Sequence, residues 1–148
     1  MYLLSFVKKF SYSAREQLLN PKKIYCIDSG LRKAVSFVFS EDWGKLTENL
    51  VFNELKKQEL EVYYWKGRGE VDFIVKEGKK VTQLIQVCYE LSDPFTKERE
   101  IKSLVEASAE LRCKNALVIT SDNEGEEKHK GLVVKFVPLW RWLLSPAG

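Results

Sequence analysis

The sequence predicts a mixed α/β domain in which helices flank a sheet, and two observations support this fold class. The chain has 148 residues, of which 45% are hydrophobic, so it is long enough to bury one core. Helix-like and strand-like segments follow one another in the order helix, three strands, helix, strand. We divide the chain into an N-terminal part, residues 1–40, and a core, residues 41–148.

The N-terminal part is expected to form a hairpin and a short helix. Residues 2–10 and 22–27 have the composition of strands, and the polar connection between them contains an Asn-Pro pair. Asp28 is a suitable N-cap for a helix that begins at Ser29, because its side chain can accept a hydrogen bond from a free backbone N–H group.

The core begins with a helix over residues 46–57, whose apolar residues recur at spacings of three and four. Three strands are expected to follow it, over residues 62–65, 70–75 and 81–89. The breaks between them contain glycine and are short enough for hairpins, so these strands are expected to be antiparallel. The apolar stripe of the helix is expected to face this sheet, and it consists of Leu46, Leu50, Val51, Phe52 and Leu55.

The second half of the core is expected to return the chain to the sheet. Asp93 as N-cap, with Pro94 after it, opens a helix of roughly four to five turns. The apolar run 116–120 follows this crossover and predicts a parallel strand that is buried on both faces. Residues 121–130 predict a flexible loop, and residues 132–137 a further strand. A short terminal helix from Pro138 is expected to close the core with Trp140, Trp142, Leu143 and Leu144.

Composition excludes several classes of function. The formal net charge of +3 is mild, so it permits a nucleic-acid partner without requiring one. Three cysteines without C-x-x-C spacing and a single histidine, His129, argue against a disulfide scaffold, a zinc site and a histidine-dependent triad. We find no P-loop, no signal peptide and no apolar run of the ~20 residues that a membrane span needs. We therefore expect a soluble, cytoplasmic protein without a membrane partner.

Four residues are candidates for a functional site. Glu48 lies beside the apolar stripe of its helix, where a charge is expected to meet a cation, a metal or strong donors, unless it sits at the edge of the stripe and reaches water. Asp72 interrupts a strand, which indicates either a functional site or a solvent-facing position on an edge strand. Gln86 and Cys88 are two apart on one strand and are expected to share a face.

The segments that carry these residues resemble the three motifs of the PD-(D/E)XK nuclease superfamily: 47–51 (TENLV), 69–73 (GEVDF) and 86–89 (QVCY). More closely, the chain resembles the C-terminal module of prokaryotic, archaeal-type AAA ATPases, from 22–31 (KKIYCIDSGL) to 138–144 (PLWRWLL). The resemblance implies a restriction-endonuclease-like core. In that family an ATPase domain and a winged helix precede the module, and residues 1–40 resemble the tail of the winged helix.

In nucleases of this superfamily, two acids and the helix Glu hold magnesium or manganese, and a nearby Lys helps to activate water. Carried over to this chain, Glu48 and Asp72 match the pattern, but the second acid is Gln86 and the lysine is Cys88. Gln86 keeps a carbonyl oxygen for a metal but loses a negative charge, and a thiol supplies no positive charge. Cys88 is equally well explained as a small core residue.

Other residues are candidates to replace the missing groups or to contact nucleic acid. Lys66, which ends the preceding strand, and Glu70, about 6.6 Å along the strand from Asp72, are the candidates to rescue the site. Lys76 is a poor substitute, because it lies about 13 Å along the strand from Asp72. Candidate nucleic-acid contacts lie at predicted turns and strand ends, although ordinary solvated turns explain them equally well: Lys22, Lys23, Lys66 and Arg68.

The leading expectation is a catalytically impaired nuclease-fold module that binds nucleic acid or assists an AAA-type ATPase on a separate chain. A second hypothesis is an active, metal-dependent DNA endonuclease that uses a displaced lysine. A third is a protein-interaction or assembly domain that does not bind nucleic acid. A homodimer is compatible with each of the three.

Overall fold

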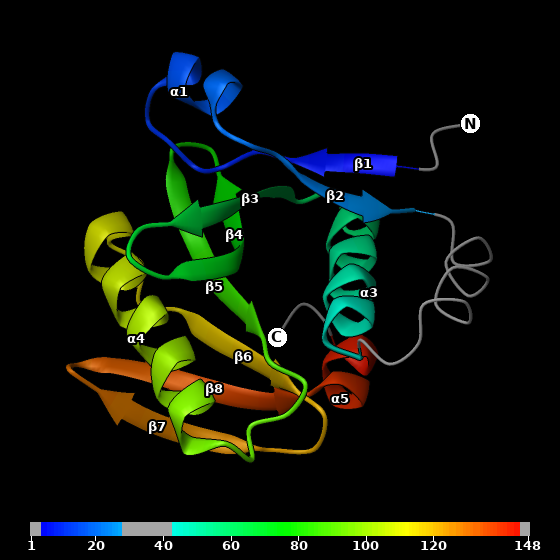
Figure 1. Ribbon diagram of the computed structural model, residues 1–148, viewed down its shortest axis with the longest axis vertical. Coiled ribbons are helices and arrows are strands. Elements are labelled where there is room, and N and C mark those ends of the chain that lie inside the picture. Colours follow the sequence, from blue (N-terminus) through cyan, green and yellow to red (C-terminus); the bar gives the residue numbers. More distant parts are fainter. Residues whose placement is uncertain (1–3, 28–42, 146–148) are drawn as a thin grey trace.

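The computed structural model of the chain describes residues 4–27 and 43–145. Within them a two-stranded sheet, β1-β2, lies beside a larger sheet with the strand order β3-β4-β5-β6-β8-β7 (Figure 1). The elements run in the order β1 (Leu4–Val7), α1 (Ala14–Leu19), β2 (Lys23–Cys26), α3 (Trp43–Lys57), β3 (Glu61–Lys66), β4 (Glu70–Glu77), β5 (Lys80–Val87), α4 (Pro94–Leu111), β6 (Ala116–Thr120), β7 (Gly125–His129), β8 (Leu132–Pro138) and α5 (Leu139–Leu144). The mixed α/β class is therefore confirmed.

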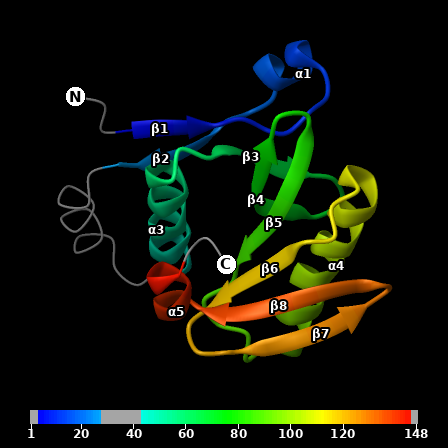
Figure 2. The ribbon, with the colours of Figure 1, turned by 180° about the vertical axis from the view of Figure 1, so that it is seen from behind.

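Helices cover both faces of the larger sheet. Helix α4 packs on one face with Ile101, Leu104 and Leu111, and α3 packs on the other with Phe52 and Leu55. Figures 1 and 2 show α3 and α4 on opposite sides of the sheet, and α5 beside the first turns of α3. The sheet thus separates two apolar clusters. In the described part of the chain, none of the helices combines the length and the apolarity that a membrane span requires.

The N-terminal hairpin is present, but its connection is not a simple polar loop. β1 and β2 pair antiparallel, with Phe6 opposite Ile24 and Val7 opposite Lys23. The connection contains the helix α1, which was not expected from the sequence. The Ser13 side chain caps this helix by accepting a hydrogen bond from the Glu16 N–H group. The helix expected from Ser29 lies outside the described residues.

The predicted core helix corresponds to α3, but its buried face is shifted from the predicted stripe. Val51, Phe52 and Leu55 are buried as expected, whereas Leu50 is exposed. Thr47 and Asn49 are buried in addition, because this side of α3 faces the N-terminal hairpin as well as the sheet. Helix α3 therefore packs against both the N-terminal hairpin and the larger sheet.

Strands β3, β4 and β5 pair antiparallel as predicted, and β6 returns parallel to β5 after the α4 crossover. Each residue of β6 is buried, as expected for a strand covered on both faces. Asp93 caps α4 by accepting hydrogen bonds from the N–H groups of Phe95 and Thr96, which confirms the predicted start of this helix. The carboxyl ends of β5, β6 and β8 consequently point the same way.

The flexible loop predicted over residues 121–130 is wrong in part, because this segment contains β7. The strand pairs antiparallel with β8 through a turn at Lys130 and Gly131, whose φ angles are 49° and 83°. Its charged side chains give this segment the composition of a loop. They are also suited to an edge strand, where charge discourages pairing with another chain.

The terminal helix α5 closes the core only in part. Trp142 is buried against the α3 face of the sheet, whereas Trp140 is 57% exposed and Leu143 and Leu144 are also exposed. The prediction that this helix closes the core is therefore correct for Trp142 and wrong for the other three residues. A helix of this length presents one face to the core and leaves the rest to solvent.

Candidate functional site

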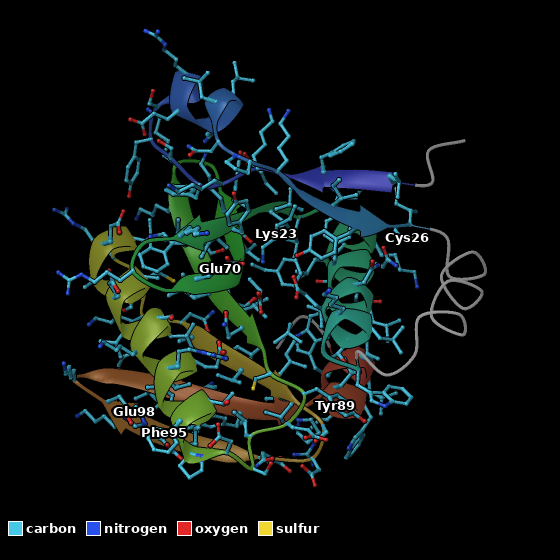
Figure 3. The ribbon with its side chains drawn as sticks, viewed as in Figure 1. Lys23, Cys26, Glu70, Tyr89, Phe95 and Glu98 are labelled. Carbon is cyan, nitrogen blue, oxygen red and sulfur yellow. The ribbon has the colours of Figure 1, made fainter. Side chains whose placement is uncertain are left out.

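The ammonium group of Lys23 lies among three carboxylates where the N-terminal hairpin meets the core. Its Nζ atom is 3.4 Å from Glu48 Oε1 and 3.2 Å from Asp72 Oδ1, and it also forms an ion pair with Glu70 Oε1. Figure 3 shows Lys23 extending from β2 toward Glu70 on β4. Three elements, β2, α3 and β4, thus meet at one cation. We call these four residues the Lys23 cluster.

Helix α3 holds β2 in the position that brings Lys23 into the cluster. Both backbone groups of Cys26 bind the Asn49 side chain: the N–H group donates to Oδ1 at 2.9 Å, and the carbonyl oxygen accepts from Nδ2 at 2.7 Å. The Tyr25 ring stacks on Phe52 with its centroid 4.5 Å away, and its hydroxyl donates to Glu48 Oε1 at 2.5 Å. Because Lys23 and Tyr25 are two apart on β2, both side chains point to the core.

Asp72 lies where the pairing between β4 and β5 ends. The ladder stops at Phe73 opposite Ile85. Beyond that point side chains replace backbone pairing: the Val87 N–H group donates to Asp72 Oδ2 at 2.9 Å, and the Asp72 N–H group donates to Gln86 Oε1 at 2.9 Å. Asp72 is only 9% exposed and β4 is an internal strand, so a solvent-facing position on an edge strand is excluded.

Burial and neighbouring charges shift the ionisation of the cluster. Burial and the negative charge of Glu48 raise the pKa of Asp72 to about 7, although Lys23 and the Val87 N–H group act in the opposite direction. Burial alone lowers the pKa of Lys23, but the charges of Asp72 and Glu48 outweigh this effect, and the net pKa is raised. Burial, followed by the charge of Glu48, raises the pKa of Tyr25. Lys23 is therefore a cation at neutral pH, and Tyr25 is a neutral donor.

Gln86 and Cys88 share a face, as predicted, but this is the face that α4 covers. The Gln86 amide Nε2 donates to Glu100 Oε2 on α4, while its oxygen is bound to the Asp72 N–H group. Cys88 packs in the α4 core cluster, and its thiol donates to the Glu90 carbonyl oxygen at 3.2 Å. Burial and the charge of Glu100 raise the pKa of Cys88 to about 11, so the thiol is neutral. Cys88 therefore lies outside the Lys23 cluster, whereas Gln86 binds the backbone of Asp72, a member of the cluster, but none of its charged groups.

The described residues, arranged in this way, do not fit a metal ion. The space between the carboxylates contains the Lys23 ammonium, and Gln86 directs its oxygen to a backbone N–H group. Among residues 4–27 and 43–145, no group of three or more His, Cys, Asp or Glu side chains is placed to hold a metal. The metal role predicted for Glu48, Asp72 and Gln86 stays a prediction, and this geometry requires Lys23 to leave first.

The remaining candidate residues divide between the cluster and the surface. Glu70 belongs to the cluster, whereas Lys66 is exposed opposite Glu70 and lines a separate hollow with Lys9 and Tyr12. Arg68 and Lys22 are exposed, so both can reach a partner. Lys23, proposed from the sequence as a nucleic-acid contact, is instead bound within the cluster.

The sequence did not lead us to expect Lys23, Tyr25 or Asn49 beside Glu48 and Asp72. The inward direction of Lys23 could have been predicted from the sequence. In the segment KIYC, Lys23 alternates with Ile24 and shares the parity of Tyr25, so a buried Tyr25 implies that Lys23 also points inward. Their contact with Glu48 joins residues that are 25 and 23 positions apart, and no local pattern predicts such a contact.

Comparison with known proteins gives a family but no activity. No protein of known structure matches the chain. An uncharacterized protein of Methanocaldococcus jannaschii, MJ1544, is 36% identical over 155 aligned positions, which cover 97% of this chain and 34% of the relative. The chain thus spans about a third of the length of this curated relative. The family model described as "Domain of unknown function (DUF4143)" matches residues 43–142, from the start of α3 to Trp142 in α5. The chain therefore belongs to the DUF4143 family.

Proposed function

We propose that this chain is a nuclease-like module that no longer cuts, and that it binds nucleic acid or assists an AAA-type ATPase on a separate chain. The observation that carries this proposal is the position of Lys23, whose ammonium lies among Glu48, Glu70 and Asp72. A divalent cation and an ammonium compete for the same oxygen atoms. The tethered Lys23 therefore supplies an internal positive charge where a metal-dependent enzyme needs its ion.

The order of elements supports a PD-(D/E)XK-like core. A helix carrying Glu48 precedes three antiparallel strands, of which the second carries Asp72 and the third Gln86, and a helix then leads to a parallel strand. This is the order that the resemblance implies. The altered third motif supports the loss of cutting, because Gln86 and Cys88 are both neutral and their polar atoms already bind the Asp72 N–H group, Glu100 and the Glu90 carbonyl oxygen.

The partner is proposed from the sequence resemblance and from the size of the relative. The chain resembles the C-terminal module of archaeal-type AAA ATPases, and MJ1544 contains a matching region within a chain about three times as long. We also propose that residues 1–40, which resemble the end of a winged helix, are a remnant of such a domain. Exposed Lys22, Lys66 and Arg68 are the proposed contacts to nucleic acid phosphates.

One observation favours the alternative of an active DNA endonuclease. Lys23 is within 3.4 Å of both Glu48 and Asp72, which is where a displaced lysine is needed to stabilise a hydroxide. The two functions predict different effects of Lys23→Met on DNA cleavage. In the impaired module this variant destabilises the fold and gains no cutting, whereas in an active nuclease the wild type cuts and the variant does not.

The test is a cleavage and binding panel on the whole chain. Single-stranded, duplex and branched DNA are incubated with magnesium or manganese, and binding is measured at two salt concentrations. We expect no cleavage, together with binding that weakens steeply as salt rises, because each phosphate contact releases counterions. Cleavage that disappears in Asp72→Ala overturns the proposal. An absence of binding at low salt removes the nucleic-acid role and leaves either assistance of an ATPase or the third hypothesis, a protein-interaction domain.

A further inference from the structure

The N-terminal hairpin has an apolar face that the described residues do not cover. In the β1–β2 register Phe6 lies opposite Ile24, and Leu4 lies opposite Cys26. Phe6 and Ile24 are each 59% exposed, and Leu4 is 51% exposed. The other face of the same hairpin carries Val7 and Tyr25, which are buried against the core. We call the surface formed by Leu4, Phe6 and Ile24 the outer face of the hairpin.

Positive charge borders this outer face. Lys8 and Lys22 continue the alternation of Phe6 and Ile24 beyond the same end of the hairpin, where Val7 pairs with Lys23, and both lysines are exposed. Neither lysine forms an ion pair with another described residue. The helix α1, between the two strands, buries none of its own residues and exposes Leu18 and Leu19. Contiguous exposed apolar residues with a charged border are typical of a surface that binds another protein.

The comparisons connect the hairpin with a larger protein context. The family match begins at residue 43, so the hairpin lies outside it. The match to MJ1544 nevertheless covers 97% of this chain, so it takes in most of the hairpin, and that relative is about three times as long. The hairpin is thus shared with a protein in which the module is joined to additional polypeptide.

We propose that the outer face of the hairpin docks an acidic amphipathic helix of a partner protein. The apolar side chains of the helix cover Leu4, Phe6 and Ile24, and its flanking carboxylates pair with Lys8 and Lys22. A second copy of this chain is disfavoured because it brings a second set of lysines to the same border. Nucleic acid is disfavoured because it leaves the apolar side chains uncovered. The proposal rests on the proposed role as a module that works with another protein, but it is independent of whether the core cuts DNA.

The test uses two synthetic helical peptides of about 18 residues with the same leucine stripe, one flanked by Glu and the other by Lys. Fluorescence anisotropy measures their binding to the full chain. We expect the acidic peptide to bind at least about tenfold more tightly than the basic one. Binding is expected to be lost in Phe6→Asp, and the preference is expected to reverse in Lys8→Glu/Lys22→Glu. Hydrogen exchange is expected to slow in β1 and β2 when the acidic peptide binds.

Phe95→Asp is the matched control, because Phe95 is exposed on α4, away from the hairpin. It is expected to bind the acidic peptide as the wild type does, and circular dichroism confirms that each variant is folded. Equal binding of the two peptides, unchanged binding in Phe6→Asp, or no saturable binding overturns the proposal. So does a dimer in sedimentation that Phe6→Asp dissociates, or binding to phosphatidylserine vesicles without binding to the acidic peptide. Any of these results leaves the cleavage test of the proposed function unaffected.

Discussion

Replacing Lys23 by methionine removes the cation of the cluster while keeping most of the side-chain volume. Removing one partner of a buried ion pair costs about 3–5 kcal/mol. The Lys23 and Glu48 side chains keep 22% and 23% of their exposure, so solvent screens part of this effect. We therefore expect the variant to lose about 2–3 kcal/mol of unfolding free energy. For a chain of this size the melting temperature falls by about 4–12 °C.

Urea denaturation followed by tryptophan fluorescence measures this loss. The loss is expected to be larger near pH 8 than near pH 5.5, because Asp72, with a pKa of about 7, is neutral at the lower pH and then needs no cation. Lys22→Met is the control: Lys22 is the exposed neighbour of Lys23, and its replacement is expected to change stability by less than about 0.5 kcal/mol. If both variants are equally stable, Lys23 is not the counter-ion of the cluster and our reasoning is refuted.

Three further predictions concern the surroundings of the cluster. Asp72→Asn removes a carboxyl whose pKa is higher in the folded than in the unfolded chain. The wild type loses the stability of the protonated carboxyl as the pH rises through about 7, so the unfolding free energy of the variant should rise relative to that of the wild type between pH 4 and pH 7. Denaturation series measure this difference, and a difference that stays constant with pH contradicts the prediction. Gln86→Glu, which supplies the acid that the proposed nuclease motif lacks, places a carboxylate against Glu100 and should cost roughly 2–4 kcal/mol. Glu100→Gln should restore part of this stability, and Gln83→Glu on the same strand should have little effect. An equally stable Gln86→Glu is the contrary outcome. Asn49→Ala removes the two hydrogen bonds that Asn49 forms with the Cys26 backbone, while Asn53 keeps its bond to the Cys26 carbonyl oxygen. The variant should lose about 1–3 kcal/mol of stability, and hydrogen exchange should accelerate in β2 but not in β6. Unchanged exchange in β2 means that Asn49 does not hold the hairpin.

Local signals predicted the parts of the fold that local interactions determine. Asp93 and Pro94 mark the start of α4 because capping acts within one turn. The continuous apolar run of β6 is itself the consequence of burial on both faces. β7 escaped prediction because its stability comes from pairing with β8, and its charged residues resemble those of a loop. α1 was missed for a related reason, since a short helix with no buried residue leaves no apolar period.

The candidate site was predicted by residue type but not by geometry. Glu48 and Asp72 were recognisable because a charge beside an apolar stripe and an acid inside a strand both violate local preference. Their common partner Lys23 comes from the hairpin, and only the folded chain brings it to them. The parity of Gln86 and Cys88 was predicted correctly, but sequence spacing does not reveal which face of the sheet they occupy. Packing against α4 places Cys88 outside the cluster and leaves Gln86 joined to it only through the Asp72 N–H group.

Manganese binding tests most directly whether the Lys23 ammonium takes the place of a metal ion. Electron paramagnetic resonance of free manganese is recorded as the wild-type chain is added to an equimolar amount, and the same sample is assayed for DNA cleavage. The proposed function predicts that the signal of the free ion is unchanged and that the DNA stays intact. Stoichiometric loss of the free-ion signal together with cleavage, both abolished in Asp72→Ala, contradicts it.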